Sequence, residues 1–149
     1  MTLMVQDLRV TFPLDGKMGL RAVDGVSFDL APGTSLGIVG ETGAGKTTIA
    51  RALLGLHPPE CVQGSIRLDG RELVGLSEEE WRAIRWRRIA LVPQSVGTAL
   101  NPVYRVGDQI AEPMRYHLGL SPAEAWGRSL EIARRVGLEP RHLRAYPHQ

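Results

Sequence analysis

Gly40-Glu41-Thr42-Gly43-Ala44-Gly45-Lys46-Thr47 is the stretch that decides the fold of this chain, because it fits the pattern G-x-x-x-x-G-K-[ST]. Glycines allow the backbone to close around an anion without Cβ clashes, so that successive N–H groups point at it. In loops of this kind the lysine reaches the β- and γ-phosphates of a nucleotide, and the hydroxyl binds Mg²⁺. The motif therefore predicts a phosphate-binding loop in which Lys46 and Thr47 have these two roles.

The segments on either side of the loop have the character that such a loop requires. Residues 35–39 form a short apolar run, which predicts a buried strand that enters the loop. Residues 47–54 place Ile49, Ala52 and Leu53 on one face of a helix that leaves it. The N-terminus of that helix also favours phosphate through its free N–H groups and its dipole. Strand, loop and helix in this order predict nucleotide binding.

The composition limits the other classes of function. The 149 residues carry a net charge of +2, which gives little indication of nucleic-acid binding, and 43% of them are hydrophobic, which is enough for a core. The only cysteine, Cys61, excludes an internal disulfide, and we expect it to be a small structural side chain. The four histidines lack metal-ligand spacing; they are His57, His117, His142 and His148. Neither a membrane-spanning run nor a signal pattern is present, so we expect a soluble cytoplasmic protein whose membrane role requires a partner.

The N-terminal part of the chain predicts an antiparallel hairpin. Apolar residues alternate in residues 3–12 and again in residues 21–30, and a turn is expected at residues 13–16 between them. Phe12 ends the first of these strands. Its pattern alone is equally consistent with a core aromatic side chain and with a ligand contact.

The middle of the chain predicts two further strands and one helix. The strands are expected at residues 64–70 and 89–92, and Ser77-x-x-Glu80 forms a capping box that opens a helix through about Arg87. Four arginines alternate with two tryptophans here; they are Arg82, Arg85, Arg87, Arg88, Trp81 and Trp86. Such a stretch could bind nucleic acid, but we favour a solvated helix face with partly packed tryptophans.

The last third of the chain predicts a loop followed by helices. Residues 95–103 have loop composition, and residues 106–118 have helical spacing with a kink or break at Pro113. Ser121-Pro-Ala-Glu124 opens a helix to about Val136, and residues 139–145 predict a further helical turn. The fold class is therefore α/β, with a β subdomain and P-loop core at residues 1–99 and a helical subdomain at residues 100–149.

Several stretches together resemble the ATPase subunits of ABC transporters, specifically those of oligopeptide and dipeptide importers. The resemblance covers essentially the whole chain and rests on Ala22-Val-Asp-Gly-Val-Ser-Phe28, Leu36-Gly-Ile-Val-Gly-Glu-Thr-Gly-Ala-Gly-Lys-Thr47, Pro93-Gln94, Ala99-Leu-Asn-Pro102, Gly107-Asp-Gln-Ile-Ala-Glu-Pro113 and Tyr146-Pro-His-Gln149. It implies an ABC-type nucleotide-binding domain with an N-terminal antiparallel β subdomain and the start of a helical subdomain. It also implies an ATPase that uses ATP and Mg²⁺.

The resemblance assigns roles to particular residues. Phe12 matches the aromatic residue that stacks on adenine. Gln94 matches the glutamine that contacts Mg²⁺ or the attacking water, so that Lys46 and Gln94 are the expected catalytic residues and Thr47 and Gln94 the expected metal ligands. The expected nucleotide contacts are Phe12, Gly40, Glu41, Thr42, Gly43, Ala44, Gly45, Lys46, Thr47 and Thr48.

The resemblance also implies partners. In this family the helical subdomain docks on membrane permease subunits at the cytoplasmic face, and two ATPase subunits form a head-to-tail dimer with ATP between them. An extracytoplasmic solute-binding protein takes part indirectly, and nucleic acid is not an expected partner. The transported solute stays open among dipeptides, oligopeptides, nickel and other small solutes.

After a segment that matches residues 146–149, members of this family continue into an L-S-G-G-Q signature, an acidic strand, a catalytic glutamate and a switch histidine. Because phosphoryl transfer depends on such groups for positioning and charge stabilisation, we expect these 149 residues alone to bind nucleotide at most. The sequence thus predicts part of a transport ATPase. One alternative is a naturally truncated module that binds nucleotide or permease without hydrolysis. Another is a soluble ABC-type ATPase that acts on nucleic acid through the Arg82–Arg88 cluster.

Overall fold

The computed structural model describes residues 1–14, 17–94 and 99–149. It separates into two compact units, Met1–Leu91 and Val92–Gln149, and each is described here by itself. The division that the sequence predicts between residues 99 and 100 differs by eight positions from this border, and residues 95–98 of the expected loop lie outside the described residues.

The first unit begins with the predicted antiparallel hairpin. Strands β1 (Leu3–Leu14) and β2 (Lys17–Leu30) pair from Leu3↔Leu30 to Leu14↔Lys17, so both are longer than the sequence pattern predicts. Residues 15 and 16 of the expected turn lie outside the described residues. A register shift between Val5 and Leu8 allows Val5, Leu8 and Val10 all to point into the core despite their unequal spacing.

Two further strands complete a sheet in the order β2-β1-β3-β4. Strand β3 (Val62–Leu68) follows a single 3₁₀ turn, η1 (Pro59–Cys61), and pairs antiparallel with β1. Strand β4 (Arg71–Glu72) returns along β3 after a tight turn in which Asp69 and Gly70 both have positive φ. Cys61 is buried and free, as a structural side chain is expected to be.

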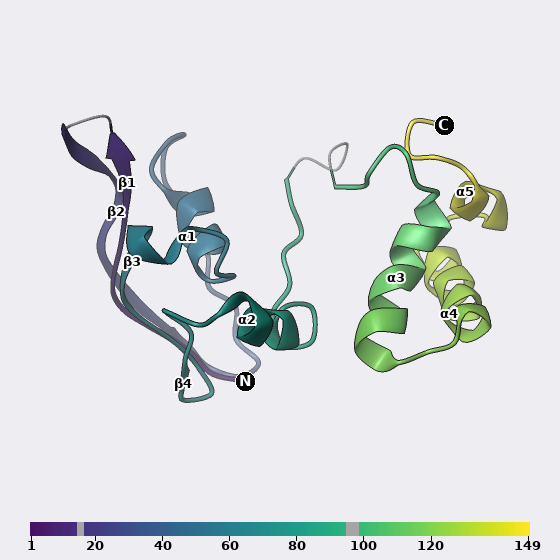
Figure 1. Ribbon diagram of the computed structural model, residues 1–149, viewed down its shortest axis with the longest axis horizontal. Coiled ribbons are helices and arrows are strands. Elements are labelled where there is room, and N and C mark those ends of the chain that lie inside the picture. The colour runs from purple at the N-terminus through teal and green to yellow at the C-terminus, as the bar shows by residue number, and fades with distance from the viewer. Residues whose placement is uncertain (15–16, 95–98) are drawn as a thin grey trace. The chain divides into compact units, whose positions relative to one another are not determined.

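Helices α1 (Lys46–Ala52) and α2 (Glu78–Ile84) lie on the same side of this sheet, as Figure 1 shows. Their apolar side chains meet the inner face of the sheet in one core; its members include Val5, Leu8, Val10, Val23, Ile49, Ala52, Ile66, Leu73, Trp81 and Ile84. This arrangement fixes the start of α1, which is the end of the phosphate-binding motif, against the hairpin.

Helix α2 has the predicted capping box but ends three residues earlier than expected. The Ser77 side chain accepts from the Glu80 amide while the Glu80 carboxylate accepts from the Ser77 amide. At the other end Arg85 leaves the helical conformation, with ψ 143°, and its guanidinium donates to the carbonyls of Leu54 and Gly55. Trp86 then has a φ of 69°, which breaks the helix.

The strands predicted at residues 35–39 and 89–92 are absent, and the prediction was wrong for both. Neither segment is assigned as a strand, and the only pairing nearby within the described residues is an isolated bridge between Arg85 and Ile89. Val39 and Val92 are 93% and 91% exposed. A buried parallel strand requires hydrogen-bonded neighbours and covered faces, and within the described part of the chain no strand lies alongside either segment.

The described residues of the second unit form three helices, which the sequence predicts closely. They are α3 (Val106–Leu118), α4 (Pro122–Arg135) and α5 (Pro140–Arg144). Pro113 lies inside α3 without ending it. Ala111, Met114 and Ala125 form the contact between α3 and α4. Among the described residues no helix is both long enough and apolar enough to cross a membrane.

Candidate nucleotide-binding site

The glycine-rich loop runs over the surface of the first unit and ends against the hairpin. Gly43 and Gly45 have φ values of 87° and 84°, which residues other than glycine rarely adopt. Gly45 is also the N-cap of α1, and a Cβ atom there would lie 2.4 Å from the carbonyl oxygen of Ala22 in β2. The third glycine of the motif is therefore required both by its conformation and by the close approach of β2.

The lysine of the motif folds back into the loop. Lys46 Nζ donates to the carbonyl oxygens of Gly40 and Glu41, at 2.7 Å each. The Ala44 amide donates to the same Glu41 carbonyl at 3.1 Å, which closes the turn. The arrangement holds one ammonium group inside a curved, solvent-exposed stretch of backbone, with the exposed Thr47 next to it on α1. A phosphate bound at this loop would compete with these two carbonyls for the ammonium group.

Phe12 lies in the same unit as this loop, two residues along β1 from the strand pair that meets Gly45. Gly45 faces Ala22 and Val23 of β2, and Val23 pairs with Val10 of β1. Phe12 follows Val10 by two residues on the same strand and is partly buried against the core. The structure therefore brings Phe12 and residues 40–48 together in one unit.

The structure adds one residue that the sequence reasoning did not select. His57 follows the end of α1, and its ring meets the ring of Phe12 edge-to-face, with centroids 5.3 Å apart and an interplanar angle of 74°. Its Nε2 lies 3.1 Å from the carbonyl oxygen of Thr48 in α1. The sequence contained a weak indication, since His57 comes shortly after the helix of the motif, but the pattern gave no reason to pair it with Phe12.

The ATP and Mg²⁺ that the motif implies fit the residues present. The loop is exposed, and a Cβ atom added at Gly43 would have no heavy atom within 4 Å. In the contacts described, the ammonium group of Lys46 has only backbone carbonyls as partners. Lys46 and the loop amides could hold phosphate oxygens, and the Thr47 hydroxyl is a hard oxygen ligand of the kind Mg²⁺ accepts beside phosphate.

A family model described as ABC transporter matches residues 23–149, which is most of the chain. The chain belongs to the ABC transporter family. The match begins in β2, extends through the loop and includes the helices of the second unit.

Relatives that carry transport names are similar over most of this ABC transporter chain. The dipeptide transport ATP-binding protein DppD of Lactococcus lactis subsp. cremoris is 42% identical over 135 residues, which cover 87% of this chain and 39% of the relative. The oligopeptide transport ATP-binding protein OppF of Escherichia coli is 40% identical over 154 residues, which cover 97% of this chain and 45% of the relative. The chain thus spans less than half the length of these two relatives. The predicted resemblance to peptide-importer ATPases is confirmed.

Solved structures show the same fold. The ATP-binding cassette MJ0796, in a dimeric post-hydrolysis state bound to ADP and Pi, matches with a TM-score of 0.82 at 21% identity; the match covers 99% of this chain and 62% of that one. A bacterial Atm1-family ABC exporter with ATP bound matches with a TM-score of 0.64 at 28% identity, over 97% of this chain and 23% of that one. The predicted fold class, part of an ABC-type nucleotide-binding domain, is confirmed.

Gln94 is exposed and belongs to the second unit, whereas the loop belongs to the first. The structure therefore describes Gln94 and Lys46 separately, and the catalytic and metal-binding role of Gln94 stays a prediction.

The arginines around α2 pair with carboxylates. Arg85 Nη1 lies 2.8 Å from Glu78 Oε1, Arg82 Nε lies 3.8 Å from the same oxygen, and Arg88 pairs with Asp69. Trp81 is buried in the core, and Trp86 is 41% exposed. This geometry agrees with the favoured reading of this stretch as a solvated helix face with partly packed tryptophans.

The carboxylates with shifted pKa values in the first unit have structural partners. Burial raises the pKa of Glu72, but hydrogen bonds from the Ser65 hydroxyl and the Ile66 and Val74 amides outweigh it, and the net pKa is lowered. The Ser77 amide lowers the pKa of Glu80 within the capping box. These groups stabilise turns and helix ends, and they lie outside the glycine-rich loop.

Proposed function

We propose that this chain is the nucleotide-binding part of the ATP-binding subunit of an ABC importer for peptides or similar small solutes. The observation that carries the proposal is the conformation of the glycine-rich loop, in which Gly45 is left-handed against β2 and Lys46 lies within the curve of the backbone. The transport names of the relatives support the cargo class.

The residues of the proposed site would act on different parts of the nucleotide. Lys46 would leave the carbonyls of Gly40 and Glu41 and bind the β- and γ-phosphate oxygens, while amides of residues 43–48 donate to the same phosphates. Phe12 would stack on adenine, a contact that any base with a π-face can make. Thr47 and Gln94 would hold Mg²⁺, which neutralises phosphate charge when it is bound.

The proposed partners follow from the relatives. The helices α3–α5 would dock on permease subunits at the cytoplasmic face of the membrane, and a second ATP-binding subunit would pair head-to-tail across the nucleotide. The dimeric state of the similar cassette supports this pairing. A solute-binding protein on the other side of the membrane would deliver cargo to the permease.

A second part of the proposal concerns hydrolysis. Among the 149 residues, the resemblance assigns Lys46 and Gln94 to catalysis and no carboxylate to the attacking water. We propose that this stretch alone binds ATP and has negligible turnover. In the family, hydrolysis requires the catalytic glutamate, the acidic strand and the signature of the second subunit to act together. Release of phosphate by the purified 149-residue chain, lost in Lys46→Ala, would overturn this part of the proposal.

Binding itself is tested with the two lysines of the chain. Titration calorimetry with Mg²⁺–ATP should show that Lys46→Ala lowers the affinity at least about 10-fold, because a charged hydrogen bond to phosphate is lost. The matched control is Lys17→Ala, which removes the only other lysine and should leave the affinity unchanged. Equal affinity for the wild-type chain and Lys46→Ala would contradict a phosphate site in the loop.

A further inference from the structure

We propose that His57 is a positioning residue of the nucleotide site, which holds the ring of Phe12 at a fixed place relative to the phosphate-binding helix. The inference rests on the proposed function, since it takes Phe12 as the contact to the base. On this proposal, His57 contributes to the affinity for the adenine base and does not contribute to the affinity for the phosphates.

His57 contacts both parts of the proposed site. Its ring packs edge-to-face on Phe12 at 5.3 Å, and its Nε2 bonds to the carbonyl of Thr48 at 3.1 Å. Thr48 lies in α1, two residues after Lys46. The His57 side chain thus links Phe12, which is expected to contact the base, to helix α1, which is expected to contact the phosphates.

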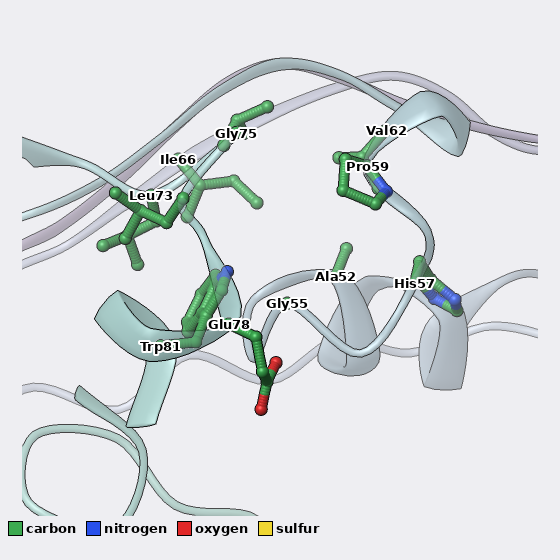
Figure 2. Close-up of a pocket in the computed structure, with 12 residues that line it drawn as sticks. Ala52, Gly55, His57, Pro59, Val62, Ile66, Leu73, Gly75, Glu78 and Trp81 are labelled. Atoms are coloured by element: carbon green, nitrogen blue, oxygen red, sulfur yellow. The ribbon is translucent and has the colours of Figure 1, made fainter. Parts of the chain in front are cut away.

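The space behind His57 is not filled by other side chains. A cavity of about 230 Å³ lies between α1, β3 and α2, with His57 at one end and Trp81 towards the other, as Figure 2 shows. Ala52 and Gly55, at the end of α1, form part of its wall. Removal of the imidazole would add its volume to this cavity, so that Phe12 would lose its edge contact and gain room to move.

The backbone alone does not determine where the Phe12 ring lies. Phe12 is near the end of β1, where the pairing with β2 shifts register between Phe12 and Leu14. It is only partly buried, whereas Val10, two residues earlier, is fully buried. A ring at the edge of the core needs a lateral partner to keep one orientation, and His57 supplies it.

The test compares ATP with inorganic tripolyphosphate, which lacks a base, on the full chain. We expect His57→Ala to lower ATP affinity about 2- to 10-fold, the worth of an aromatic pair, and to leave tripolyphosphate affinity within about twofold. His57→Phe keeps a ring against Phe12 but lacks the bond to Thr48, so it should restore the ATP affinity only in part. His148→Ala, a histidine of the second unit, should change neither affinity.

Phe12→Ala separates the two levels of the proposal. It should lower ATP affinity and spare tripolyphosphate, and the double variant Phe12→Ala with His57→Ala should bind ATP no more weakly than Phe12→Ala alone. If Phe12→Ala leaves ATP affinity unchanged, the proposed adenine contact itself fails. If Phe12→Ala weakens ATP but His57→Ala does not, or weakens tripolyphosphate equally, only the role of His57 is overturned.

Discussion

At the residue scale, the site depends on a few positions where backbone geometry admits only one residue type. Gly45 has a φ of 84°, and a Cβ atom added there would lie 2.4 Å from the carbonyl oxygen of Ala22. Gly33 has a similar φ of 74°, but an added Cβ would meet nothing within 4 Å. Substitution of the two glycines by alanine therefore distinguishes the free-energy cost of the left-handed conformation from the additional cost of a steric clash.

We predict that Gly45→Ala destabilises the first unit clearly more than Gly33→Ala. The control should cost about 1–2 kcal/mol for the left-handed backbone alone, and Gly45→Ala should add the displacement of β2 from the loop. Urea unfolding followed by tryptophan fluorescence measures both. Equal losses of unfolding free energy in the two variants would show that the loop does not need its close approach to β2.

The sequence predicted some residues of the site better than others, for a physical reason. Lys46, Thr47 and the glycines are contiguous, so their spacing alone indicates phosphate chemistry. Phe12 needed the family resemblance, because its alternation pattern also suits a core residue. His57 was missed because its contact with Phe12 spans 45 positions and depends on how α1 packs against the hairpin.

At the element scale, Arg85 connects the two helices of the first unit. Its guanidinium donates to the carbonyls of Leu54 and Gly55 beyond the end of α1, lies 2.8 Å from Glu78 and stacks 5.2 Å from the centre of the Trp81 ring. The side chain is only 23% exposed. It therefore supplies hydrogen-bond donors to two carbonyl groups of the turn that follows α1.

We predict that Arg85→Met lowers the unfolding free energy of the first unit by about 1–3 kcal/mol, because two carbonyls lose a charged donor while the aliphatic volume is kept. The matched control on the same helix is Arg82→Met. The Arg82 side chain is 66% exposed, and its guanidinium is 3.8 Å from Glu78, so this change should cost under about 0.5 kcal/mol. Equal effects of the two substitutions on urea midpoints would contradict the anchoring role of Arg85.

A second element-scale prediction concerns the capping box of α4. The Ser121 hydroxyl and amide hold the pKa of Glu124 below its ordinary value. A carboxyl group with a lowered folded pKa stabilises the protein above its unfolded pKa, near 4.5, and this contribution is lost as the pH falls through the folded pKa. Glu124→Gln removes the titration and keeps an acceptor.

The loss of helix stability on acidification below about pH 4.5 should therefore be smaller in Glu124→Gln than in the wild-type chain. Thermal melts followed by circular dichroism between about pH 6 and 3 provide the comparison. Ser121→Ala, which removes the hydroxyl that lowers the pKa, should also flatten the dependence. An unchanged pH dependence in both variants would show that the box does not act through the charge of Glu124.

Elements with local signals were predicted well, and elements that need distant partners were not. Ser77 and Ser121 marked the starts of α2 and α4, because a capping box is a contact within one helical turn. The strands expected at residues 35–39 and 89–92 have the right composition but no neighbouring strand within the described residues. An apolar run therefore predicts the preference for a strand, whereas pairing depends on the rest of the sheet.

At the scale of the whole molecule, the described residues form an antiparallel sheet, a glycine-rich loop and its helix in one unit and three helices in another. The apolar segment before the loop is open to solvent, with Val39 93% exposed, while Gly43 and Gly45 in the loop after it have left-handed φ values. Local geometry at Gly43, Gly45 and Lys46 thus exists without a paired strand in front of it. The central claim is that this geometry is enough to hold nucleotide phosphates.

The most direct test is a nuclear magnetic resonance titration of the isotope-labelled 149-residue chain with Mg²⁺–ATP. The amide resonances of residues 40–48 should shift and saturate together, with smaller shifts at Phe12 and His57 on the base side. Tripolyphosphate should shift the amide resonances of the loop and leave the resonance of Phe12 unshifted, because it has no base. Shifts that cluster away from the loop, or no saturable shift at Gly43, Gly45 and Lys46, would contradict the account.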